Sequence, residues 1–103
     1  MPVWGITAIR TAPNSDRITR VRWQQIDSAE NEWIGDQSVA EAHEVANELA
    51  VGNLVYSIHT LPDGNTVHGA QARHVVYQGG DEALDSLEPE NHHGRTLHDL
   101  LHF

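Results

Sequence analysis

The 103-residue chain contains no cysteine and no lysine. The absence of cysteine excludes disulfides and thiolate metal sites, and it is compatible with a reducing compartment. The absence of lysine excludes Schiff-base chemistry and the lysine of a phosphate-binding loop. The unusual feature of the composition is its histidine content, with eight residues.

The sequence also lacks a long apolar run. No window approaches the roughly 20 apolar residues that a transmembrane helix requires. Residues 1–26 contain no charged segment followed by a continuous apolar one, which is the pattern of a secretory signal. We expect a soluble, cytoplasmic, single-domain protein that does not contact a membrane.

Positive charge is scarce, because six arginines stand against fifteen acidic residues and the formal net charge is −9. Four of the arginines lie within residues 1–22, whereas the acids concentrate in 27–48 and 81–90. Nucleic acid is not an expected partner, since neutralising phosphates requires clustered cations. We expect ion pairs across the fold. We also expect a homodimer, formed through the sheet face or an edge, in which the arginine-rich hairpin meets an acidic segment of a second copy.

The segment 38–52 is typical of an amphipathic helix with a defined beginning and end. Ser38 and Glu41 have the spacing of a capping box, and Gly52 suits the left-handed residue that ends a helix. An apolar stripe recurs at three- and four-residue spacing, at Val39, Ala42, Val45, Ala46, Leu49 and Ala50. The pattern predicts a helix over 38–51.

Four segments, 3–11, 17–26, 54–59 and 66–78, have the composition or alternation of β-strands. Turn signals at 12–16 and 61–65 join them as two antiparallel hairpins. Residues 27–37 have the polar composition of a connection, and the spaced leucines of 81–89 and 96–103 indicate short helical turns. The predicted fold is α+β, a four-stranded antiparallel sheet (β-β-α-β-β) with one helix packed on one face. Residues 1–89 form this domain, and 90–103 form a histidine-rich C-terminal tail that contributes little to folding.

Several of these segments together resemble a known family. They are Ile6-Thr-Ala-Ile-Arg10, Ile18-Thr-Arg-Val-Arg22, the helix ending in Gly52, and 77–89 with its tyrosine, acidic turn and spaced leucines. The pattern resembles the DUF3892 family of small bacterial and phage proteins of unknown function, over residues 3–89. The resemblance implies the fold and brings no catalytic residues.

The tail histidines are candidate metal ligands. His98 and His102 stand at i and i+4, which would place both rings on one face of a helix, and His92 and His93 lie close in sequence. This grouping predicts a zinc or nickel site. The alternative is a flexible or peripheral tail whose histidines bind metal only weakly.

A second group of histidines, His59, His68 and His74, lies on the second hairpin. Such a group could serve in acid–base catalysis if a carboxylate oriented it within a cleft. The alternative is that these are ordinary half-buried strand histidines.

The leading hypothesis is a non-catalytic binding or interaction module. Arg20, Arg22 and Gln24 alternate with apolar residues on one strand, and we expect them to form its interaction face. A histidine-based metal-binding protein and a small enzyme that uses the strand histidines are the two alternatives.

Overall fold

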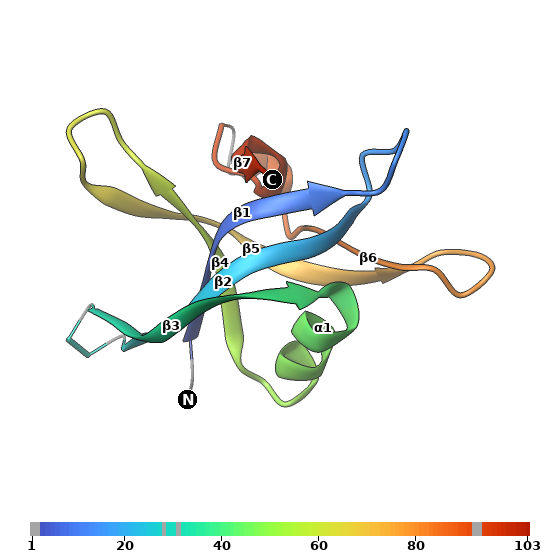
Figure 1. Cartoon of the computed structure of the whole chain (residues 1–103), viewed down its shortest axis with the longest axis horizontal. Helices are drawn as coiled ribbons and strands as arrows, with labels where there is room; N and C mark the ends of the chain where they lie inside the picture. The colour runs from blue at the N-terminus through green and yellow to red at the C-terminus, as the bar shows by residue number, and fades with distance from the viewer. Residues whose placement is uncertain (1–2, 28, 31, 92–93) are drawn as a thin grey trace.

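The computed structural model describes residues 3–27, 29–30, 32–91 and 94–103 (Figure 1). Within these residues the chain forms seven β-strands, one α-helix and two short 3₁₀-helices. In chain order the elements are β1 (Val3–Thr11), β2 (Ile18–Asp27), β3 (Glu32–Glu41), α1 (Ala42–Ala50), β4 (Leu54–Thr60), β5 (Thr66–Val76), β6 (Glu82–Ser86), η1 (Pro89–Asn91), η2 (Leu97–Asp99) and β7 (Leu101–His102).

The predicted four-stranded antiparallel sheet is wrong, although the protein still combines a sheet with a helix as an α+β fold. In the described part of the chain, seven strands form one mixed sheet in the order β3-β2-β6-β5-β4-β1-β7, and β1 also pairs with β2. These pairings close β1, β2, β6, β5 and β4 into a ring, in which β2 and β6 are joined by the single pair Ile18 and Leu84. β1 pairs in parallel with β4 and with β7. Turn residues in a sequence indicate pairing only between consecutive strands. They could not predict that β1 also pairs with β4 and β7.

Both predicted hairpins are confirmed as antiparallel pairs. β1 and β2 pair from Val3 opposite Ile26 to Thr11 opposite Ile18. A hydrogen bond of 2.9 Å from the Ala12 amide to the Arg17 carbonyl closes the turn between them. This register places Arg10 of β1 directly opposite Arg20 of β2.

The segment predicted as a polar connection is the strand β3, paired with β2. Its side chains are exposed from Glu32 to Val39, so no alternation of apolar and polar residues marked it as a strand. A bulge interrupts the pairing, because residues 35–37 lie opposite Gln24 alone. Gly35 adopts a φ of 69° in this bulge, and its carbonyl accepts a hydrogen bond from the Gln24 side chain.

The helix is shorter than predicted, because α1 begins at Ala42 instead of 38. Ser38 pairs with Trp23 in the sheet, and the side chain of Glu41 makes no capping hydrogen bond. Residues 38–41 therefore pair with the edge of β2 as a strand and do not form the predicted capping box. Gly52 follows the helix with a φ of 88°, which confirms the predicted stop.

The main core is formed by side chains of the ring strands together with α1 and the end of the chain. Ala42 and Val45 of the helix are buried there, and Leu49 is half-buried against it. Side chains from the ring strands complete this core, among them Ile6, Ile9, Ile18, Val21, Trp23, Val55, Ala72 and Leu84. No helix in the described residues is long and apolar enough to cross a bilayer.

Residues 94–103, called the C-terminal segment from here on, dock on the opposite side of the crossing strands from α1 (Figure 1). Leu97 and Leu100 are 0% and 6% exposed and belong to the main core. β7 pairs with β1, and the Phe103 amide donates a hydrogen bond of 2.9 Å to the Ile9 carbonyl. The segment therefore completes the core, which differs from the peripheral tail expected from the sequence.

Candidate functional site

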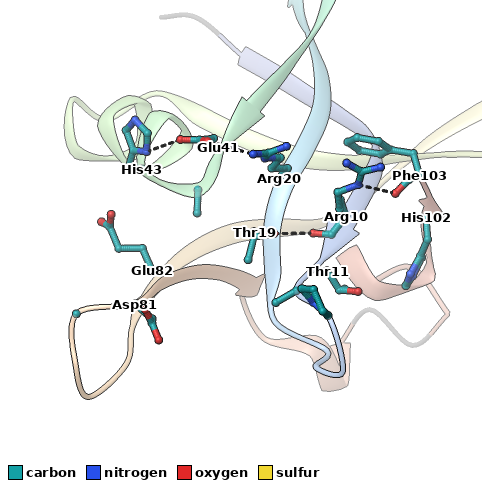
Figure 2. Close-up of a pocket in the computed structure, with 14 residues that line it drawn as sticks. Arg10, Thr11, Thr19, Arg20, Glu41, His43, Asp81, Glu82, His102 and Phe103 are labelled. Carbon is teal, nitrogen blue, oxygen red and sulfur yellow. Dashed lines mark hydrogen bonds and ion pairs between the residues drawn. The ribbon is translucent and has the colours of Figure 1, made fainter.

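A groove of about 740 Å³ opens on the surface where four parts of the chain meet (Figure 2). They are the β1–β2 hairpin, the junction of β3 with α1, the turn before β6, and the last residues of the C-terminal segment. The lining residues are Arg10, Thr11, Ala12, Pro13, Thr19, Arg20, Glu41, Ala42, His43, Gly80, Asp81, Glu82, His102 and Phe103. Five of these fourteen residues are charged and four more have polar side chains, so the groove suits a polar ligand.

One end of the groove is built from arginines and Phe103. Arg10 and Arg20 are paired directly across the β1–β2 hairpin, an arrangement of like charges that costs stability. The Arg10 Nε donates a hydrogen bond of 3.0 Å to the Phe103 backbone oxygen. The Phe103 ring also lies against two guanidinium groups, with centroid distances of 5.2 Å to Arg10 and 4.8 Å to Arg22. These contacts hold the two arginines in place.

The acidic side chains of the groove have partners within the chain. Glu41 lies between Arg20 and His43, with N–O distances of 3.6 and 3.4 Å. Asp81 pairs with Arg17 at 3.9 Å, and Glu82 lies 2.9 Å from the His74 ring. The ion pairs expected from the sequence are thus confirmed. Among the described residues, no aspartate or glutamate side chain lies within ion-pair distance of Arg10 or Arg22.

The predicted interaction residues separate into two places. Arg20 lines the groove, and Arg22 contacts Phe103 at its edge. Gln24 is instead engaged in the β3 bulge through the Gly35 carbonyl. Arg10 and Phe103 were not predicted from the sequence. Arg10 could have been found from the hairpin register, which places it opposite Arg20, but no sequence signal brings residue 103 to this site.

The three strand histidines do not form one cluster. His68 lies against the Tyr56 ring at 5.2 Å, and His74 contacts Glu82. They stand six positions apart along β5, a span of about 20 Å in an extended strand. His59 lies on β4 with its Nε2 2.9 Å from the Ser57 hydroxyl. Acid–base chemistry that uses all three together is therefore not supported.

Ser57 and His59 instead hold the C-terminal segment. The Ser57 hydroxyl donates a hydrogen bond of 3.2 Å to the Arg95 carbonyl, so its oxygen accepts from His59 Nε2. The Ala70 amide donates to the same carbonyl at 2.9 Å. We call these four residues the Arg95 anchor. Ser57 is 0% exposed, which closes it to a substrate.

Burial lowers the pKa of His59 from its ordinary value near 6.5. A hydrogen bond with the Arg95 backbone and the negative charge of Asp99 raise this pKa in part, and the positive charge of Arg95 lowers it. Desolvation is the largest effect, so the neutral imidazole is favoured in the folded protein.

The predicted metal ligands make hydrogen bonds to the backbone. His98 Nε2 lies 2.7 Å from the Asp16 carbonyl, and His102 Nε2 lies 3.2 Å from the His98 carbonyl. His92 and His93 lie outside the described residues. Within the described residues, no three histidine or carboxylate side chains gather as a metal site would require. Zinc or nickel binding stays a prediction.

Comparison of the chain with protein-family models, curated proteins and solved structures finds no match. The resemblance to the DUF3892 family therefore stays a prediction. Functional inference rests on the geometry of the groove.

Proposed function

We propose that this protein is a non-catalytic binding module and that the groove is its binding site. The observation that carries the proposal is the set of charged and polar side chains that four separate parts of the chain bring to one cavity of about 740 Å³ (Figure 2). This volume is in the range of small-molecule sites. The Ser57 and His59 pair, which has the residue types of a hydrolytic site, lies under the C-terminal segment and away from the groove lining. That arrangement favours binding over catalysis.

Backbone amide shifts of the isotope-labelled protein test this proposal. The probes are separate sets of nucleotides, sugar phosphates, dicarboxylates, amino acids and tripeptides, each recovered afterwards and checked for chemical change. We expect at least one set to shift the amides of Thr11, Thr19 and Gly80, which line the groove, and to return unaltered. Turnover of a probe, or shifts that avoid the groove for every set, would contradict the proposal.

Self-association through β3 is a second candidate function. β3 is the terminal strand of the sheet in the described chain, and Trp33, Ile34 and Val39 on it are 43%, 41% and 53% exposed. Unpaired backbone at a sheet edge is a template for pairing with a second copy, and these three exposed apolar side chains would gain cover from it. The dimer expected from charge complementarity is less favoured, because Arg17 and Arg20 already have acidic partners in the same chain.

Sedimentation at micromolar concentration tests the dimer. We expect a dimer that persists in high salt, since backbone pairing and the three apolar side chains would hold it, and that dissociates in an Ile34→Lys variant. Substitution of exposed Val76 by Lys is the matched control, because Val76 is 60% exposed and lies on β5, away from β3. A wild-type monomer in all conditions would contradict this candidate.

Two narrower expectations also stay proposals. The absence of cysteine is compatible with a cytoplasmic location, which cell fractionation tests. The net charge of −9 disfavours nucleic acid, and a gel-shift assay at low salt with duplex DNA and single-stranded RNA should show no complex.

A further inference from the structure

Half of the positively charged side chains of this acidic protein converge on one place. Arg10 lies opposite Arg20 in the hairpin register, and Arg22 lies opposite Ala8 on the same pair of strands. Because side chains alternate along a strand, Arg20 and Arg22 share a face of β2. Three of the six arginines, in a chain with fifteen acids, thus stand together at one end of the groove.

Phe103 holds two of these arginines and leaves their hydrogen-bonding capacity available. The Arg10 Nε bonds to the Phe103 backbone oxygen, which leaves both terminal nitrogens of Arg10 as donors. Arg22 contacts the ring through its guanidinium group, at 4.8 Å from the centroid. Figure 2 shows the Arg10 guanidinium against Phe103, with Arg20 on the adjacent strand. An arginine fixed by stacking loses less side-chain freedom when it binds an anion.

One side-chain carboxylate in the described residues, that of Glu41, lies against the three arginines at this end of the groove. Arg20 has Glu41 as a partner, but in the described chain neither Arg10 nor Arg22 lies within ion-pair distance of an aspartate or glutamate side chain. The chain has fifteen acidic residues, and none of the other described acidic side chains pairs with these arginines. Neighbouring guanidinium groups repel one another, and a bound anion would relieve this repulsion with charge-assisted hydrogen bonds.

We propose that Arg10 and Arg22, supported by Phe103 and joined by Arg20, form an oxyanion site that binds the phosphate or carboxylate group of a ligand in the groove. The proposal rests on the proposed binding function and names the chemical group that the groove recognises. The hydroxyl groups of Thr11 and Thr19, which also line the groove, are available to the rest of the ligand.

Titration with inorganic phosphate and with succinate tests the site and separates the two sources of the oxyanion. Amide shifts and calorimetry are recorded at low ionic strength, and sodium chloride of equal ionic strength serves as the reference. We expect saturable binding of at least one probe, with shifts at Arg10, Thr19 and Phe103. Phosphate alone would indicate a phosphorylated ligand, and succinate alone a carboxylate ligand.

Single variants assign the effect to the proposed residues. Arg10→Gln and Arg22→Gln should each weaken binding by about tenfold or more, because each removes a charged hydrogen-bond donor. Phe103→Leu keeps every charge and should weaken binding less. Arg73→Gln is the control, since Arg73 pairs with Asp85 at 3.3 Å and does not line the groove. Circular dichroism establishes that each variant is folded.

The proposal is overturned if neither probe binds above the chloride reference, or if Arg10→Gln and Arg22→Gln bind as well as Arg73→Gln. In that case neutral or cationic probes that still shift the groove amides would leave the binding function intact. Failure of the oxyanion site and failure of the groove are therefore distinguishable.

Discussion

The Ser57 hydroxyl donates a 3.2 Å hydrogen bond to the Arg95 carbonyl, although 38 positions separate the two residues. Ser57 is fully buried on β4, and Arg95 begins the approach of the C-terminal segment to the core. The same carbonyl accepts the Ala70 amide of β5. One peptide oxygen thus fastens the C-terminal segment to two strands of the ring, and through Phe103 that segment reaches the groove.

Gly69→Ala should destabilise the protein, because a Cβ at this position would collide with the Arg95 carbonyl oxygen and the Ser57 hydroxyl. Overpacking of this kind costs about 1–3 kcal/mol. Urea unfolding measures the change. The cost should be smaller when Gly69→Ala is introduced into a Ser57→Ala background, since one of the colliding atoms is then gone. Equal costs in both backgrounds would show that Ser57 does not restrict this space.

Leu97→Ala should lower the free energy of unfolding by about 2–5 kcal/mol, the usual cost of truncating a fully buried leucine. Leu97 is 0% exposed, whereas Leu101 in the same segment is 69% exposed. Leu101→Ala is therefore the control, with an expected change within about 0.5 kcal/mol. By the same reasoning, a chain shortened to residues 1–89 should lose cooperative unfolding. Similar midpoints for the two leucine variants would mean that the segment does not contribute to the core.

Stability should fall as the pH decreases below about 6.5, through the titration of His59. Burial lowers the pKa of His59 in the folded state, so the unfolded chain takes up the proton first and unfolding is favoured in acid. The contribution is fully present above the unfolded pKa and is lost as the pH falls toward the lower folded pKa. Urea midpoints at pH 7.5 and 5.5 measure this effect.

The matched variant for the pH experiment is His59→Gln, which cannot titrate. Asp99 and Arg95 act on His59 with opposite signs, and both are retained in this variant. The drop in stability between the two pH values should be smaller than in the wild type. An unchanged drop would assign the pH dependence to groups other than His59.

Ile18→Ala should weaken the contact between β2 and β6 that closes the ring of strands. Ile18 is 0% exposed and pairs with Leu84, which alone links β2 to β6 in the described chain. We expect a loss of about 2–5 kcal/mol and faster hydrogen exchange at the β6 amides than at those of β4. Ile34→Ala, at a 41% exposed position, is the control. Uniform acceleration across the sheet would indicate global destabilisation without selective opening.

Local signals predicted the elements that depend on local interactions. The β1–β2 and β4–β5 hairpins followed from alternation and turn residues, and Gly52 marked the helix end because its conformation is a property of one residue. β3 was missed because its side chains are exposed on both faces. Ser38 and Glu41 have the spacing of a cap, but the edge of β2 offers them backbone pairing that a single-sequence pattern does not contain.

The candidate site was predictable only in part for the same reason. Arg20 and Arg22 were found from the alternation within β2. Arg10 required the register of the hairpin, and Phe103 required the docking of the C-terminal segment beside β1. The histidines were grouped by sequence proximity, whereas His59 and His68 belong to different environments once β4 and β5 pair.

The ring also determines how quickly this protein can reach its native state. β1 pairs with β2, its neighbour in sequence, but also with β4 and with β7, whose residue His102 lies beside Ile9. Forming these pairs requires the closure of long chain loops, and the conformational entropy is lost before the contacts form that offset it. Folding should therefore be slow for a small domain, on the order of milliseconds to seconds. It should also be incomplete until residues 97–103 dock, so partly folded chains would expose the edge of β1 to intermolecular pairing.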